Sequence, residues 1–203
     1  MQQYDSGGER PSKHPTVALV FFEEQDYELR DTLLASVEEF FDWLKGELSA
    51  QPRFSLWNAR NPENIPTQNQ DRVFFPLLEE VNGNIVLGIT GTGFYDPSLP
   101  RFVFSYGSCS GRALLSTYRF RTESHNRSIY LDRVRKQIIK TLAMACGLSA
   151  CSRPDCVISY HRWVEDLDRN QCVCDRCRSS LIQSLSGFLK QDDGGDDYYR
   201  AYA

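Results

Sequence analysis

Hydrophobic and polar residues follow two different periods in the first half of the chain. Residues 16–22 (TVALVFF) form a continuous apolar run rich in β-forming side chains, which predicts a buried strand. Over residues 29–48 apolar side chains return every three or four positions with acidic residues between them, which predicts an amphipathic helix. Further strands are predicted around residues 54–57 and over residues 85–90, with a loop at 61–72 and an Asn-Gly turn at 82–83.

The second half of the chain repeats both patterns and then changes character. Strand-like runs at residues 101–106 and 113–120 flank the Gly/Ser-rich stretch GSCSG. From about residue 129 to 146 the spacing is helical again, and Gly147 follows as a left-handed terminator. The remaining chain is rich in cysteine and closes with a short amphipathic helix over residues 181–189.

Length and composition fit one globular domain. The chain has 203 residues, of which 41% are hydrophobic, and no apolar run approaches the roughly 20 residues needed to cross a bilayer. The first residues lack the apolar segment of a secretory signal, which predicts a cytoplasmic protein with no membrane partner. Residues 1–14 are polar and residues 191–203 are acidic, so both are predicted to be mobile tails around a single domain of residues 15–190.

Charge is distributed unevenly along the chain. Residues 1–100 hold 7 basic and 16 acidic side chains, whereas residues 101–140 hold 9 basic and 2 acidic ones. A basic stretch of this density suits either an anion-binding face or packing against the acidic N-terminal half, and packing is the favoured interpretation.

The most specific chemical signal is a cluster of cysteines near the C-terminus. Five of the seven cysteines lie between residues 151 and 177, and in a reducing compartment such clustering suits metal ligation better than disulfides or free thiols. Two close pairs, Cys151 with Cys156 and Cys174 with Cys177, have the arrangement of a closed four-thiolate site for one structural Zn²⁺. Cys172 competes with Cys174 for the third position, but only Cys174 makes the two-residue spacing to Cys177.

Three stretches carry a family resemblance: NIVLGITGTGFYDPSLPRFVFSYGSCSGRALLSTYRFR at 84–121, the helix running into GLSAC at 147–151, and CSRPDCVISY through CDRC at 151–177. They resemble the archaemetzincins, whose HExxHxxGxxHC motif holds a catalytic zinc on three histidines and whose four cysteines hold a structural zinc. The resemblance implies an α/β (α+β) fold, a compact metzincin-like domain with a twisted mixed β-sheet and two long helices. It also implies an antiparallel edge strand above the cleft, matched by residues 101–106, and a C-terminal four-cysteine zinc-binding segment at 151–177.

The catalytic part of the family motif does not carry over to this chain. Aligning Gly147 and Cys151 with the motif puts Lys140 and Met144 at the two helix histidines, Thr141 at the general-base glutamate and Ala150 at the third histidine. Ile158 also stands where the family has the methionine of its Met-turn. A hydrolytic zinc needs imidazoles on one helical face and a glutamate that takes a proton from the bound water. The resemblance therefore predicts a pseudopeptidase that keeps the fold and one structural zinc.

A zinc peptidase with a rebuilt active site is the alternative. The chain has three histidines, His14, His125 and His161, and each stands alone in its segment. Only His161 lies near the family's cleft, where Cys146 or Asp166 would have to join it. A catalytic zinc needs three protein ligands and an open position, which one imidazole does not provide.

The edge strand provides the leading functional hypothesis. In the fold that the resemblance implies, this strand binds peptides by strand addition, which does not depend on a catalytic zinc. A peptide or protein partner is therefore predicted along Arg101, Phe102, Val103, Phe104, Ser105 and Tyr106. The Lys140 ammonium is predicted in the place of the lost zinc, paired with a buried acid or with a carboxylate of the partner. Nucleic-acid or phosphate binding through residues 101–140, or an interaction through the C-terminal tail, are the other options.

Overall fold

The computed structural model describes residues 16–23, 25–44, 52–96, 102–107, 110–169 and 172–188. The two tails predicted at residues 1–14 and 191–203 lie outside the described residues, as does Arg101. Among the described residues, no helix is long and apolar enough to cross a membrane.

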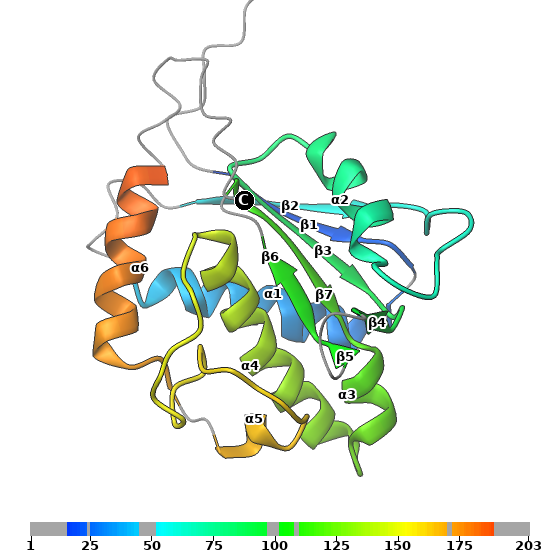
Figure 1. Cartoon of the computed structure of the whole chain (residues 1–203). Helices are drawn as coiled ribbons and strands as arrows, with labels where there is room; N and C mark the ends of the chain where they lie inside the picture. Colours follow the sequence, from blue (N-terminus) through cyan, green and yellow to red (C-terminus); the bar gives the residue numbers. More distant parts are fainter. Residues whose placement is uncertain are drawn as a thin grey trace, which may run out of the picture.

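A five-stranded mixed sheet forms the centre of the structure (Figure 1). Its strands are β1 (Thr16–Phe21), β2 (Arg53–Asn58), β3 (Ile85–Thr90), β6 (Ser105–Gly107) and β7 (Arg112–Ser116). They lie in the order β2-β1-β3-β7-β6; β6 runs antiparallel to β7, and the other pairs are parallel. The predicted antiparallel edge strand is thus present, although it is shorter than expected.

Two short strands and six helices surround this sheet. The strands β4 (Phe94–Tyr95) and β5 (Phe102–Val103) pair with each other in a separate antiparallel ribbon. The helices are α1 (Tyr27–Asp42), α2 (Asp71–Glu79), α3 (Tyr118–Glu123), α4 (Arg127–Ala145), α5 (Asp166–Arg169) and α6 (Asp175–Phe188). The two long helices predicted from hydrophobic spacing correspond to α1 and α4, and the closing helix corresponds to α6.

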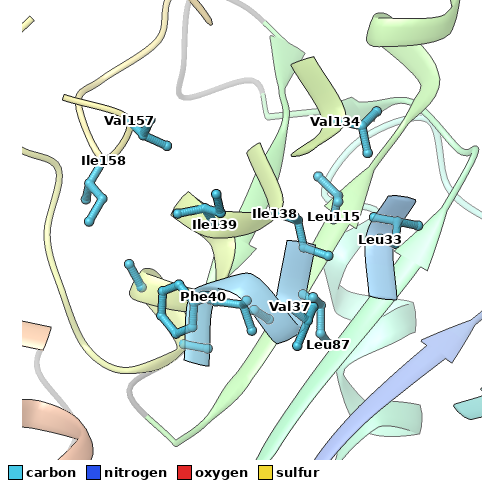
Figure 2. Close-up of a cluster of buried hydrophobic side chains, with 14 of the residues drawn as sticks. Leu33, Val37, Phe40, Leu87, Leu115, Val134, Ile138, Ile139, Val157 and Ile158 are labelled. Atoms are coloured by element: carbon cyan, nitrogen blue, oxygen red, sulfur yellow. The ribbon is translucent and has the colours of Figure 1, made fainter. Parts of the chain in front are cut away.

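Each face of the sheet packs on its own set of helices. The larger core joins the inward side chains of α1 and α4 to Leu87 and Leu115 of the sheet, and it continues into Val157 and Ile158 of the cysteine-rich segment (Figure 2). On the opposite face, Phe74 and Leu78 of α2 pack on a second cluster that includes side chains of β1, β3 and β7. Alternate residues of the buried strands therefore pack into two separate cores. Both faces of these strands are buried, which explains why their sequences are continuous apolar runs.

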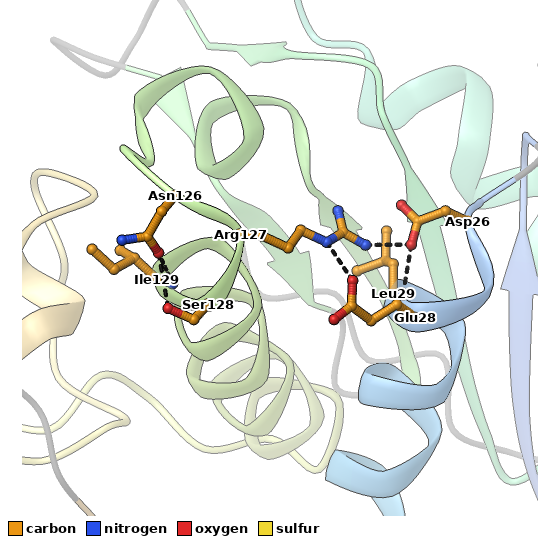
Figure 3. A network of polar contacts seen from close by, with 7 residues as sticks. All are labelled: Asp26, Glu28, Leu29, Asn126, Arg127, Ser128 and Ile129. Atoms are coloured by element: carbon orange, nitrogen blue, oxygen red, sulfur yellow. Dashed lines mark hydrogen bonds and ion pairs between the residues drawn. The ribbon is translucent and has the colours of Figure 1, made fainter.

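The acidic helix α1 and the basic helix α4 are joined by ion pairs. Arg127, at the start of α4, contacts the carboxylates of Asp26 and Glu28, its Nε lying 2.8 Å from Glu28 Oε2 (Figure 3). Further along the same helices, Arg135 Nη2 lies 2.6 Å from Glu39 Oε1. The interpretation that the basic stretch packs against the acidic N-terminal half is confirmed for these side chains.

Three sequence predictions differ from the structure. The strand expected over residues 113–120 ends at Ser116, and residues 118–123 form helix α3, so Arg119 and Arg121 are helical. The reason is tertiary: Phe120 is fully buried, with its ring 5.3 Å from that of Phe104, and a helical turn delivers it there. The strand expected over residues 101–106 is interrupted at Phe104, and the helix α2 begins at Asp71, within the loop expected over residues 61–72.

Candidate functional site

The end of α4 leads the chain directly toward the cysteine cluster. Gly147 has φ +84°, the left-handed conformation predicted for it, and Cβ-bearing residues rarely adopt this value. The N–H of Gly147 donates to the Met144 carbonyl, and the N–H of Leu148 donates to the Ala143 carbonyl, which satisfies two carbonyls of the last helical turn. This turn reverses the chain and brings Cys151 back beside the helix α6.

The four cysteines predicted as zinc ligands come together in space. The Sγ atoms of Cys151, Cys156, Cys174 and Cys177 all lie within 4.8 Å of one another, and Cys151 Sγ lies 3.8 Å from Cys174 Sγ. Because Zn–S bonds are about 2.3 Å long, the sulfurs of a tetrahedral zinc site lie about 3.8 Å apart. The cluster therefore has the dimensions and the donor atoms that fit one tetrahedral zinc.

Cys172 does not belong to this cluster, although it was a competitor for the third position. Its side chain is exposed, and its backbone forms a β-bridge with Cys156 in which the Cys172 carbonyl accepts from the Val157 N–H at 3.0 Å. Cys174, by contrast, is buried within the cluster. The backbone of residue 172 thus positions the cluster, while its sulfur lies outside it.

Hydrogen bonds from backbone N–H groups and burial shift the pKa values of the clustered thiols in opposite directions. Hydrogen bonding from the Cys177 backbone lowers the pKa of Cys174 to about 7, whereas burial raises the pKa of Cys156 and Cys177 above the usual thiol range. The N–H of Cys174 also donates to Cys156 Sγ at 3.5 Å, and the N–H of Arg153 donates to Cys151 Sγ at 3.4 Å. A bound cation would stabilise all four thiolates, which are otherwise costly to bury.

The helix positions that match the family's catalytic residues face inward. Lys140 has 8% of its surface exposed, and its Nζ donates to the Ser159 carbonyl at 2.7 Å. Burial lowers the pKa of Lys140 to about 8. Thr141 is fully buried, and its hydroxyl donates to the Gln137 carbonyl one turn earlier. Met144 is half-buried, and Ala150 is exposed on the loop after the helix.

Gln137 connects three parts of this region and was not singled out from the sequence. Its Nε2 donates to Ser105 Oγ of β6 at 2.8 Å, and its Oε1 lies 3.4 Å from His161 Nδ1. Ser105 Oγ in turn lies 3.8 Å from Met144 Sδ. Gln137 is a buried polar residue on the apolar side of α4, one turn before Lys140. A polar side chain at a core-facing helix position indicates a buried hydrogen-bonding role, and this was the signal in the sequence.

The edge strand β6 lies directly against α4. A Cβ atom on Gly107 would be 2.7 Å from Met144 Cβ, so only glycine permits this approach. Of the residues predicted to bind a partner, Ser105 and Tyr106 belong to β6, Phe104 is buried, and Phe102 and Val103 form β5, which pairs with β4. The edge of the main sheet is therefore residues 105–107 rather than the whole of residues 101–106.

The remaining histidines do not assemble a second metal site in the described part of the chain. There, the four cysteines are the one group of three or more His, Cys, Asp or Glu side chains close enough to share an ion. His161 is buried beside Gln137, and His125 is exposed before α4. Asp166 accepts from the N–H groups of Arg162 and Trp163, both at 2.8 Å, and Cys146 is buried with a raised pKa.

The mixed sheet with an antiparallel edge strand, the two long helices and the four-cysteine cluster define an α/β domain of the metzincin type. Residues 69–183 match the sequence model of peptidase family M54. The chain is 29% identical over 164 residues to the archaemetzincin of Methanopyrus kandleri, covering 77% of this chain and 92% of that protein. It is 30% identical over 142 residues to the archaemetzincin of Aeropyrum pernix, covering 69% of this chain and 76% of that protein.

The solved structures agree with the sequence comparison. The crystal structure of the Methanopyrus kandleri archaemetzincin superposes with a TM-score of 0.69 at 26% identity, covering 87% of this chain and 98% of that one. The chain belongs to peptidase family M54, the archaemetzincin family.

Proposed function

We propose that this protein is a non-catalytic archaemetzincin that keeps one structural zinc and binds an extended peptide segment of a partner. The observation that carries the proposal is the identity of the residues on α4. Where the family motif has two histidines and a glutamate, this chain has Lys140, Met144 and Thr141, and their polar atoms are engaged in contacts within the protein.

The chemistry of these side chains supports the absence of a catalytic zinc. A hydrolytic zinc takes three protein ligands and keeps one position open for water. The Lys140 ammonium would repel a cation, Thr141 has no useful basicity, and Ala150 offers no ligand atom where the third histidine of the motif stands. These replacements affect the ligands and the general base together.

The cysteine cluster supports a structural role for the remaining zinc. Cys151, Cys156, Cys174 and Cys177 would hold the ion, and four thiolates leave no position for water or substrate. The ion would fix the segment of residues 151–177, whose described part before α6 holds one short helix, α5, and two isolated β-bridges that involve cysteines. Such a segment has little backbone pairing of its own, so metal ligation contributes much of its stability.

The edge strand supports a peptide as the partner. Strand β6 pairs with β7 on one side, and no described strand pairs with its other side. An extended peptide can add to such an edge through main-chain hydrogen bonds. Nucleic-acid binding is less favoured because Arg127, Arg133 and Arg135 of the basic stretch each pair with carboxylates of the protein.

Metal counting on the purified protein, combined with a peptidase assay, tests the proposal. We expect about one zinc per chain, because the four-cysteine cluster is the one full ligand set among the residues that the structure describes. Neither a peptide library nor an unfolded protein should be cleaved. About two zinc ions per chain together with cleavage that a chelator abolishes would contradict the proposal.

Strand addition has its own test. Extended peptides that bind should lose affinity when alternate backbone nitrogens are methylated, because one register of main-chain donors is removed. The affinity should depend only weakly on salt, whereas binding to a single-stranded oligonucleotide would fall steeply as salt is added. Peptide affinity that is insensitive to backbone methylation would show that strand addition is not used.

A further inference from the structure

The Lys140 ammonium is a buried charge without a counter-charge in the described structure. Its hydrogen bond goes to the neutral carbonyl of Ser159 at 2.7 Å, and no carboxylate of the described residues lies within 4.0 Å of Nζ. The nearby Lys136 on the same helix differs in this respect, because its Nζ lies 2.6 Å from Asp132 Oδ2. Among the described residues, Lys136 thus has a carboxylate partner and Lys140 has none.

The surroundings of Lys140 do not compensate for this charge. An ammonium has three N–H donors, and a single carbonyl accepts one of them. Gln137, one turn away, already bonds to Ser105 and lies beside His161, and the Thr141 hydroxyl is bonded to the backbone. Desolvation is the cause of the lowered pKa of Lys140, and no neighbouring acid opposes it. A charge buried in this way is stabilised most by an ionised acceptor.

Lys140 also lies where an outside group can reach it. The ring of Tyr160, which is 64% exposed, is centred 6.0 Å from Nζ, so the ammonium is close to the surface of the segment after α4. On the helix, Lys140 follows Gln137 by three residues and precedes Met144 by four, which puts all three on one face. Gln137 and Met144 both contact Ser105 of β6, so Lys140 shares its face of the helix with the edge strand.

We propose that Lys140 is a binding site for a carboxylate of the peptide partner, either an Asp or Glu side chain or a free C-terminus. The inference deepens the proposed function, on which it rests for the identity of the ligand as a peptide along β6. It assigns a carboxylate ligand to the helix position where the family motif has a histidine. The ammonium then gains an ionised acceptor that none of the described residues supplies.

Paired peptides measure this preference directly. Acetylated hexapeptide amides carrying Glu at each position in turn are compared with the same peptides carrying Gln, and a neutral hexapeptide is compared as free acid and as amide. At one Glu position, or for the free acid, we expect about tenfold tighter binding, the value of one charge-assisted hydrogen bond. The first result identifies a side-chain carboxylate as the ligand, and the second identifies a C-terminus.

Two substitutions make the test specific to Lys140. Lys140→Met keeps the length of the side chain and removes its charge, and it should abolish the preference. Lys136→Met makes the same change one turn earlier on a lysine that already has an acid partner, and it should leave the preference intact. A preference that persists in K140M, or equal binding of charged and neutral peptides to the unchanged protein, would overturn the proposal.

A second measurement does not depend on strand addition. Sodium acetate is titrated against sodium chloride at equal ionic strength while the pKa of Lys140 is followed by NMR of its labelled Cε atom. A carboxylate bound at Nζ should raise that pKa, and the labelled Cε signal of Lys136 should not respond to acetate. If no peptide binds but acetate raises the pKa, the strand-addition proposal fails and the carboxylate site stands. If neutral peptides bind without preference and acetate has no effect, only the carboxylate site is refuted.

Discussion

Replacing Lys140 by methionine should change how stability depends on pH. The native pKa of Lys140 is lowered to about 8 by burial, whereas an unfolded lysine titrates near 10.5. Between these values the unfolded chain binds a proton that the native protein has released, so wild-type stability rises with pH across this window. Methionine carries no proton, so K140M should lack this contribution.

The magnitude follows from the same two values. Multiplying the interval between about 8 and 10.5 by about 1.36 kcal/mol per pH unit gives about 3 kcal/mol, of which about 2.5 kcal/mol is gained between pH 7 and pH 10. At pH 7 methionine removes the cost of the buried charge but also removes the hydrogen bond from Nζ to the Ser159 carbonyl, a loss of about 1–3 kcal/mol. The two effects nearly cancel, so K140M should be about as stable as the wild type at pH 7.

Urea unfolding at several pH values between 7 and 10 measures this difference. The wild type and K140M share every other titratable group, so the relevant quantity is the free energy of unfolding of the wild type minus that of K140M at each pH. Lys136→Met is the control, because its side chain already pairs with Asp132, and its curve should run parallel to the wild type. Parallel curves for the wild type and K140M would refute the assignment of Lys140 as a desolvated ammonium.

Two further substitutions test the cysteine cluster and the contact between β6 and α4. Cys177→Ser should lose the bound zinc and lower the melting temperature, whereas Cys172→Ser should keep about one zinc per chain because its sulfur is outside the cluster; zinc loss in both variants would contradict this ligand set. Gly107→Ala places a Cβ 2.7 Å from Met144 Cβ and should lower the free energy of unfolding by about 1–3 kcal/mol. An unchanged urea midpoint for this variant would mean that β6 can move away from the helix.

The elements with a strong hydrophobic period were predictable from the sequence. The helices α1 and α4 each have an apolar face that repeats over several turns, and β1 and β3 are continuous apolar runs. The pairing of Cys174 rather than Cys172 with Cys177 followed from their spacing, because two thiolates with two residues between them can reach one ion. Residues close together in the sequence determine these features, so the hydrophobic period and the cysteine spacing were enough to predict them.

Elements that depend on distant contacts were not predictable in the same way. The segment around Arg119 and Arg121 alternates polar and apolar residues as a strand would, yet Phe120 must reach the ring of Phe104, and a helix places it there. The interruption of the expected edge strand at Phe104 has the same cause, because that side chain turns into the core. The role of Gln137 depends on Ser105 and His161, which are 32 and 24 residues away in the chain.

The spacing of the cysteine ligands also has a consequence for the order in which the chain matures on the ribosome. Cys151 and Cys156 follow α4, and by then every strand of the main sheet has been synthesised. Cys174 and Cys177 emerge later, at the start of α6, and only then can four sulfurs surround one ion. Metal capture is therefore a late step, and it fastens α6 to a sheet and helix pair that are already complete.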